Sequence, residues 1–138
     1  MKQVVIDSNI IFSALIRDSF TRKLILEYRG RFLFPYYIFS EIKEHQVELL
    51  QKSKVTKKEF KQMVGILVSK VEIVSHDKLS PHWEAARKII EKIDPDDDVF
   101  IACALAHPGS VIWSDDKRLK QQKEIEILNT PEFARQFI

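Results

Sequence analysis

Short apolar runs alternate along the chain with segments whose apolar positions recur at helical spacing. Residues 4–6 are a β-branched run that ends at Asp7, and the next residues place apolar side chains on one helical face. Further strand candidates are residues 31–34, 71–74, 110–113 and, with weaker alternation, 124–128. Strands that alternate with helices predict an α/β fold with a largely parallel sheet and helices on both faces.

Capping signals and amphipathic patterns predict where the helices lie. Ser19 or Thr21 is expected to cap a helix that Gly30 closes, and Thr130 to cap a short C-terminal helix. Residues 37–52 form one long amphipathic segment. Because no repeat or Pro/Gly-rich linker interrupts the sequence, we expect a single domain over residues 1–138.

Composition limits the possible environments and partners. The chain has 138 residues, 45% of them hydrophobic, which suffices for a core of its own. Because 22 Lys and Arg nearly balance 20 Asp and Glu, nucleic-acid binding would need local basic patches. Cys103 is the one cysteine, which excludes an internal disulfide. With no signal-peptide or membrane-span pattern, we expect a soluble, cytoplasmic protein without a membrane partner.

Acidic residues follow the predicted strands, where open parallel sheets bind ligands. Asp7 follows the first strand, Asp115 and Asp116 follow residues 110–113, and DPDDDVFIAC at residues 94–103 begins a helix with four aspartates. Helix capping and the helix dipole explain one or two such acids. Neighbouring carboxylates repel one another unless a cation neutralises them, and their hard oxygens suit Mg²⁺ or Mn²⁺. A divalent-metal site is therefore predicted.

A further acid is expected from the segment PYYIFSEIKEHQ. Periodicity alone does not distinguish Glu41 from Glu44 or Glu48. Glu41 precedes Ile42 at the boundary of the apolar stripe, so its side chain can turn inward.

Four strings together resemble the PIN domain nuclease family over nearly the whole chain. VVIDSNIIFSALI is similar to the family's first strand, acid and helix, and PYYIFSEIKEH to its second acidic motif. IDPDDDVFIACALA and VIWSDDKRLK resemble the third and fourth motifs. The resemblance implies a PIN-like three-layer α/β/α sandwich and a nuclease that hydrolyses RNA phosphodiester bonds with Mg²⁺ or Mn²⁺.

The motifs carry the family's functional residues onto this sequence. They imply that the catalytic, metal-binding acids are Asp7, Glu41, Asp97 and Asp116. The alternates, each adjacent to a matched position, are Asp98 and Asp115. The residues expected to support the site are Asn9, Ser114 and Asp94.

Basic residues close in sequence to the acidic motifs are candidates for guiding RNA around an acidic pocket. They are Arg17, Arg22, Lys23, Lys117, Arg118 and Lys120. Similarity to VapC-type toxins implies two further partners, a cognate antitoxin and a second copy of the chain in a homodimer.

Two other functions compete with a ribonuclease. A receiver-like signalling domain is also a small α/β fold with clustered acids and Mg²⁺, but it carries paired acids after its first strand, where this chain has only Asp7. A non-catalytic PIN-like module would bind RNA or protein without cleaving it, and the presence of all four acids disfavours it.

Overall fold

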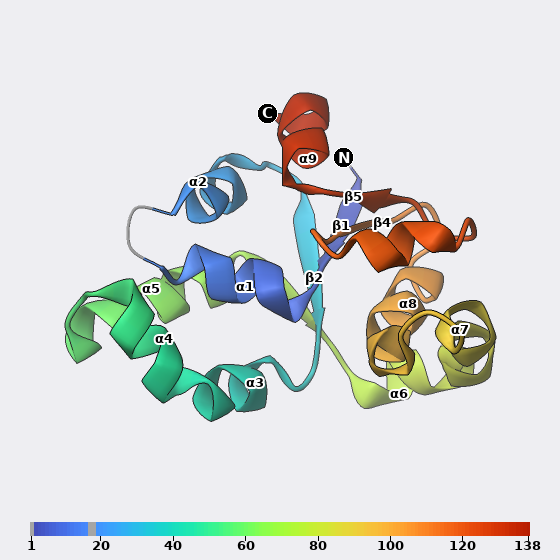
Figure 1. The fold of residues 1–138 in the computed structure, drawn as a ribbon, viewed down its shortest axis with the longest axis horizontal. Coiled ribbons are helices and arrows are strands. Elements are labelled where there is room, and N and C mark those ends of the chain that lie inside the picture. Colours follow the sequence, from blue (N-terminus) through green and yellow to red (C-terminus); the bar gives the residue numbers. More distant parts are fainter. Residues whose placement is uncertain (1, 17–18) are drawn as a thin grey trace.

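A parallel sheet forms the centre of the protein in a computed structural model, which describes residues 2–16 and 19–138 (Figure 1). Its strands are β1 (Gln3–Ile6), β2 (Arg31–Pro35), β3 (Val71–Val74), β4 (Val111–Trp113) and β5 (Ile127–Leu128). They lie in the order β3-β2-β1-β4-β5, and all four pairings are parallel. The predicted α/β class is confirmed.

Helices cover both faces of this sheet and complete the predicted three layers (Figure 1). One face carries α6 (His76–Leu79), α7 (Trp83–Ile90) and α8 (Asp98–Leu105). The other side carries α1 (Ser8–Ala14), α2 (Phe20–Glu27), α3 (Ile38–Glu44), α4 (Gln46–Ser53) and α5 (Lys57–Ser69), while α9 (Thr130–Phe137) packs beside β5. None of the described helices combines the length and apolar character needed to cross a bilayer.

The strand order reverses between β1 and β4. From β1 the chain proceeds to β2 and β3 on one side, and it later returns to place β4 and β5 on the other. Such a reversal opens a crevice at the carboxyl ends of the two central strands. In a receiver-like sheet β1 lies between β2 and β3, whereas here β2 lies between β1 and β3. The receiver-like alternative is therefore wrong.

Several predicted boundaries are corrected. The amphipathic segment 37–52 is divided at His45, which is the C-cap of α3. The His45 ring nitrogen Nδ1 lies 3.0 Å from the carbonyl oxygen of Glu41, one turn earlier. Asn129, not Thr130, caps α9, because its side chain accepts from the Glu132 amide in a full capping box. The weak strand candidate at residues 124–128 shortens to its last two residues, β5.

The start of α2 is as predicted, but its end is not. Ser19 caps the helix by accepting from the Arg22 amide at 3.1 Å. The helix ends at Glu27, before Gly30. The Tyr28 ring lies so close to Gly30 that an added Cβ there would overlap the ring. Gly30 therefore makes room for an aromatic ring and does not cap the helix.

An aromatic stack attaches the C-terminal helix to the sheet. The rings of Trp113 and Phe133 are nearly parallel, with centroids 4.1 Å apart, and both side chains are fully buried. The Trp113 indole nitrogen donates to the Thr130 hydroxyl at 3.0 Å. Because Trp113 ends β4, this packing also steadies the strand end that precedes the acidic residues of the fourth motif.

Replacing Phe133 with alanine should destabilise the protein by about 3–5 kcal/mol, because it removes a buried ring and leaves a cavity against Trp113. Urea denaturation at equilibrium measures this change. The control is Phe39→Ala at a ring that is 55% exposed, which should change stability by less than about 0.5 kcal/mol. Equal effects of the two substitutions would contradict the importance of the stack.

Candidate metal centre

Asp7 follows directly after β1, at the carboxyl ends of the paired strands β1 and β4. Ile6 pairs with Trp113, and the Asp7 amide donates to the Trp113 carbonyl oxygen at 3.3 Å. The Asp7 carboxylate caps α1 by accepting from the Ile10 amide at 3.0 Å. Burial raises the pKa of Asp7, and hydrogen bonds from Ser114 and from backbone amides partly oppose that rise. Helix capping therefore does not account for the burial of this carboxylate beside other acids.

Three further aspartates converge at the same edge of the sheet. Asp94 and Asp97 lie in the turn before α8, and Asp116 follows β4. One carboxylate oxygen from each residue lies within 4.8 Å of the other two. Hard oxygens held on short turns are the donors that Mg²⁺ and Mn²⁺ prefer. The donor set therefore fits the cation that the sequence predicts.

The DPDD sequence builds the turn that brings Asp94 and Asp97 together. Pro95 begins a 3₁₀ turn over Pro95–Asp97, where its missing amide hydrogen is not needed. The Asp94 carboxylate accepts from the Asp96 amide at 3.1 Å, and the Asp97 amide donates to the Asp94 carbonyl oxygen at 3.1 Å. Asp94, expected only to support the site, therefore places a carboxylate oxygen of its own in the group of three.

The pKa of Asp97 is raised to about 7. Burial is the largest cause, the negative charges of Asp94, Asp7 and Asp116 add to it, and Arg118 opposes it. These mutual effects place all four aspartates in one electrostatic neighbourhood. Near neutral pH and without a cation, the Asp97 carboxyl therefore retains a proton part of the time, and a cation bound there would displace that proton.

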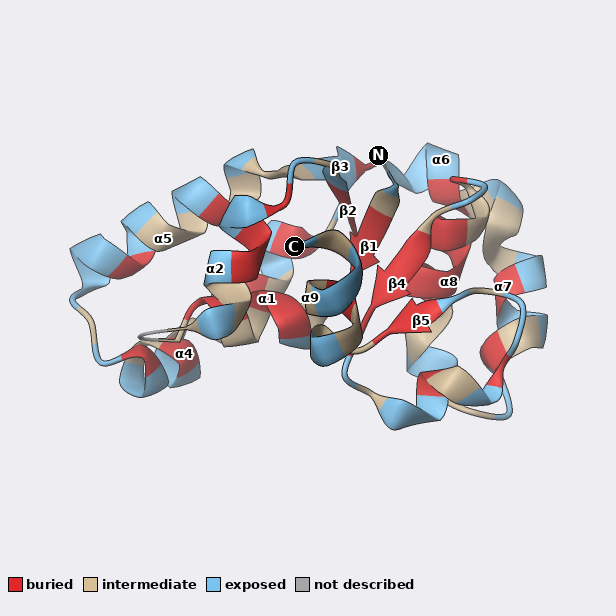
Figure 2. Ribbon diagram, turned by 90° about the horizontal axis from the view of Figure 1, so that it is seen from above, coloured by how far each residue is buried: buried red, intermediate tan, exposed pale blue. Residues whose placement is uncertain are grey.

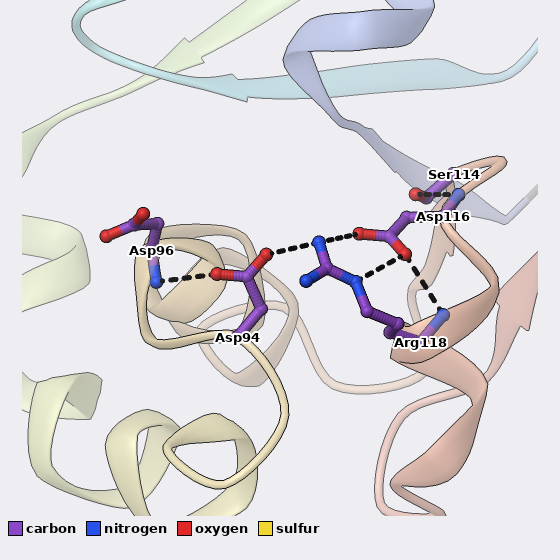
Figure 3. A network of polar contacts seen from close by, with 5 residues as sticks. All are labelled: Asp94, Asp96, Ser114, Asp116 and Arg118. Carbon is purple, nitrogen blue, oxygen red and sulfur yellow. Dashed lines mark hydrogen bonds and ion pairs between the residues drawn. The ribbon is translucent and has the colours of Figure 1, made fainter.

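Arg118 joins two of the clustered acids (Figure 3). Its Nη2 donates to Asp94 at 2.7 Å and to Asp116 at 3.0 Å, and its Nε donates to Asp116 at 3.2 Å. The Arg118 backbone amide also donates to Asp116 at 3.0 Å. These contacts hold the pKa of Asp116 below its ordinary value. Arg118 was predicted to face RNA, but here it faces the acids.

The two alternate acids make other contacts. The Asp98 carboxylate lies 3.7 Å from the Arg87 guanidinium of α7. The Asp115 carboxylate accepts from the Thr130 amide at 2.7 Å and from the Thr130 hydroxyl at 2.8 Å, which ties the end of β4 to the start of α9. This geometry favours Asp97 and Asp116 as the cation ligands.

Glu41 lies outside the group of three aspartates. It stands in the first turn of α3, where burial raises its pKa and His45 partly lowers it. Its carboxylate groups instead with Glu44 and His45. Burial has the largest effect on the pKa of Tyr37, and the negative charges of Glu41, Asp98 and Asp97 raise it further. Glu41 therefore belongs to the same acidic edge without joining the tightest cluster.

The two remaining supporting residues differ in position. Ser114 of the fourth motif is buried, and its hydroxyl accepts from the Asp116 amide at 3.1 Å. Its side chain also forms a hydrogen bond with the Asp7 carboxylate of the first motif. Asn9 is exposed on α1 and lines a groove of about 470 Å³ together with His45 of the α3–α4 junction. Ser114 thus contacts two acids, whereas the Asn9 side chain lines a groove that contains neither of them.

Several of the cations proposed for RNA contact are already engaged. Arg22 donates to the carbonyl oxygens of Ala14 and Ile16 at 2.8 and 3.0 Å, and Lys120 pairs with Glu132. Lys23 and Lys117 are exposed, and neither forms an ion pair among the described residues. Arg17 lies outside the described residues.

The comparison with known families identifies this architecture. A family model described as a PIN domain matches residues 5–133. The chain belongs to the PIN domain family. The PIN fold is also similar to a chain in the crystal structure of VapBC2 from Rickettsia felis bound to a DNA fragment from their promoter, with a TM-score of 0.66 and 19% identity. The match covers 92% of this chain and 98% of that chain. No curated protein matches this sequence.

Substituting the two adjacent acids of the fourth motif should affect different properties, protein stability at Asp115 and metal binding at Asp116. Asp115→Ala should lower the free energy of unfolding by about 1 kcal/mol, since α9 loses an anchoring carboxylate, and should leave Mn²⁺ binding intact. Asp116→Ala should abolish Mn²⁺ binding measured by titration calorimetry. If Asp115→Ala abolished binding and Asp116→Ala did not, the assignment of the two residues would be reversed.

Asp97 should make the metal-free PIN domain less stable as pH rises. Its folded pKa of about 7 exceeds the ordinary value of 3.8, so between these values the unfolded chain binds fewer protons and stability falls. Asp97→Asn should therefore melt above the wild type near pH 8 in EDTA, and close to it near pH 4. The exposed Asp77→Asn is the matched control. A wild type that melts above Asp97→Asn near pH 8 would contradict the expected sign.

Proposed function

We propose that this PIN domain is a metal-dependent endoribonuclease that hydrolyses RNA phosphodiester bonds. The observation that carries the proposal is the convergence of Asp94, Asp97 and Asp116 within 4.8 Å, beside the buried Asp7. This group lies at the reversal of strand order, where parallel sheets bind ligands. Membership of the PIN domain family supports a nuclease.

The acids would bind Mg²⁺ or Mn²⁺ and would not act as nucleophiles. Asp97 and Asp116 would be the principal ligands, and Asp94 and Asp7 would complete or orient the set. When bound, the cation supplies activation of water and compensation of phosphate charge. Ser114 would keep Asp7 and Asp116 aligned, because it contacts both. Glu41 and Asn9 would act from the rim, toward the water or substrate.

RNA would reach the acidic centre along exposed cations. Lys23 on α2 and Lys117 after β4 remain the candidates, since Arg22 and Lys120 bond within the protein. Long-range attraction from the whole chain is weak at a net charge of +2. Binding would therefore depend on these local contacts and on salt concentration.

We further propose that this chain, as one domain over residues 1–138, is the toxin of a toxin–antitoxin pair. The likeness of its fold to a chain of a VapBC2 structure supports this idea. A cognate antitoxin and a second copy of the chain would be its protein partners. A small DNA-binding protein encoded next to it would be the expected antitoxin.

Asp7→Asn and Asp97→Asn should each reduce Mn²⁺-dependent RNA cleavage by about 100-fold or more, because each removes a charged ligand or its support. Cleavage of a labelled RNA on a denaturing gel, with EDTA as the metal-free reference, measures the effect. Circular dichroism establishes that each variant is folded, and Asp77→Asn is the surface control. Full cleavage by both variants would refute the proposal. RNA binding without cleavage by the wild type would favour the non-catalytic module.

A further inference from the structure

The Arg118 guanidinium lies where the acidic centre would receive a cation. It contacts Asp94 and Asp116, two of the three aspartates whose oxygens group within 4.8 Å (Figure 3). Both carboxylate oxygens of Asp116 accept from the Arg118 side chain. In Asp94, one oxygen accepts from Arg118 and the other from the Asp96 amide. Each of these four oxygens therefore already accepts at least one hydrogen bond.

A guanidinium and a divalent cation are poor neighbours at the same oxygens. Both are positive, and a cation needs the carboxylate lone pairs toward which the Arg118 side chain directs its hydrogens. If both were bound there, repulsion between the guanidinium and the metal ion would offset their attraction to the acids. Resting on the metal-dependent function proposed above, we propose that Arg118 is the resident counter-ion of the centre and that Mg²⁺ or Mn²⁺ displaces it from Asp94 and Asp116.

The Arg118 side chain can leave without disturbing the turn on which it stands. That side chain is 57% exposed, so water can replace its partners. The hydrogen bond that shapes the turn comes from the Arg118 backbone amide to Asp116, and the Asp116 amide is held separately by Ser114. Movement of the guanidinium therefore breaks contacts to the two acids and leaves both backbone contacts in place.

The exchange explains how the acids can stay together before a cation binds. Asp94 and Asp116 are neutralised in part by the Arg118 guanidinium, which contacts both carboxylates. A cation takes over this task when it binds. Arg118 consequently raises the cation concentration that the centre requires, and its removal should lower that requirement.

The test compares Arg118→Gln with Lys117→Gln by Mn²⁺ titration calorimetry on the whole chain, without RNA. Both variants lose one positive charge, but Lys117 is exposed and has no ion pair to the acids among the described residues. Arg118→Gln should bind Mn²⁺ at least about fivefold more tightly than Lys117→Gln. It should also melt below Lys117→Gln in EDTA and gain more in melting temperature from Mn²⁺.

Equal Mn²⁺ affinity in the two variants would overturn the exchange, because charge alone would then account for any gain. Weaker binding by Arg118→Gln would overturn it too, since Arg118 would then support the bound cation. The ribonuclease proposal fails separately: tighter Mn²⁺ binding by Arg118→Gln with no RNA cleavage by the wild type would uphold the exchange and refute the nuclease. Absence of Mn²⁺ binding in every protein would refute both.

Discussion

The pairing of β1 with β4 is the constraint on which the acidic centre depends. Ile6 and Trp113 are register partners, so the residues that follow them, Asp7 and Ser114, leave the sheet side by side. Asp116 comes two residues later and is held by the Ser114 hydroxyl. β4 is only three residues long, but it is fully buried between β1 and β5 (Figure 2). Sheet pairing therefore holds carboxylates close together although they repel one another.

The fold reduces this repulsion in a different way at each acid. The Asp7 carboxylate accepts hydrogen bonds at the start of α1, where the helix dipole is also favourable. Asp94 and Asp116 share Arg118, whereas the pKa of Asp97 rises until the carboxyl is partly neutral at pH 7. A bound divalent cation would replace the guanidinium and the proton together. Each acid of the centre thus has a partial compensation for its charge before a cation binds.

Local patterns were sufficient to predict the strands, the α/β class and the acidic edge of the sheet, because buried apolar runs and acids after strands are local signals. They were insufficient where contacts between residues far apart in the sequence determine a side chain's partner or a helix boundary. Asp94 and Arg118 are 24 positions apart, and only the folded chain brings them into contact. The break at His45 likewise involves its ring against Phe12 of α1. The neighbouring aspartates Asp97 and Asp98 differ in their partners across the turn, which sequence spacing alone could not distinguish.

The basic residues show why proximity in sequence is a weak guide to substrate contact. In a chain with nearly balanced charge, a cation beside an acidic motif is as well placed to pair with that motif as to bind RNA, and Arg118 pairs with it. Under the proposed exchange, binding of a divalent cation makes the centre more positive, even after the Asp97 proton is lost, and frees the guanidinium nearby. The loaded centre would then attract a phosphate that the metal-free centre repels. RNA affinity would accordingly follow metal loading more closely than it follows the small net charge of the chain.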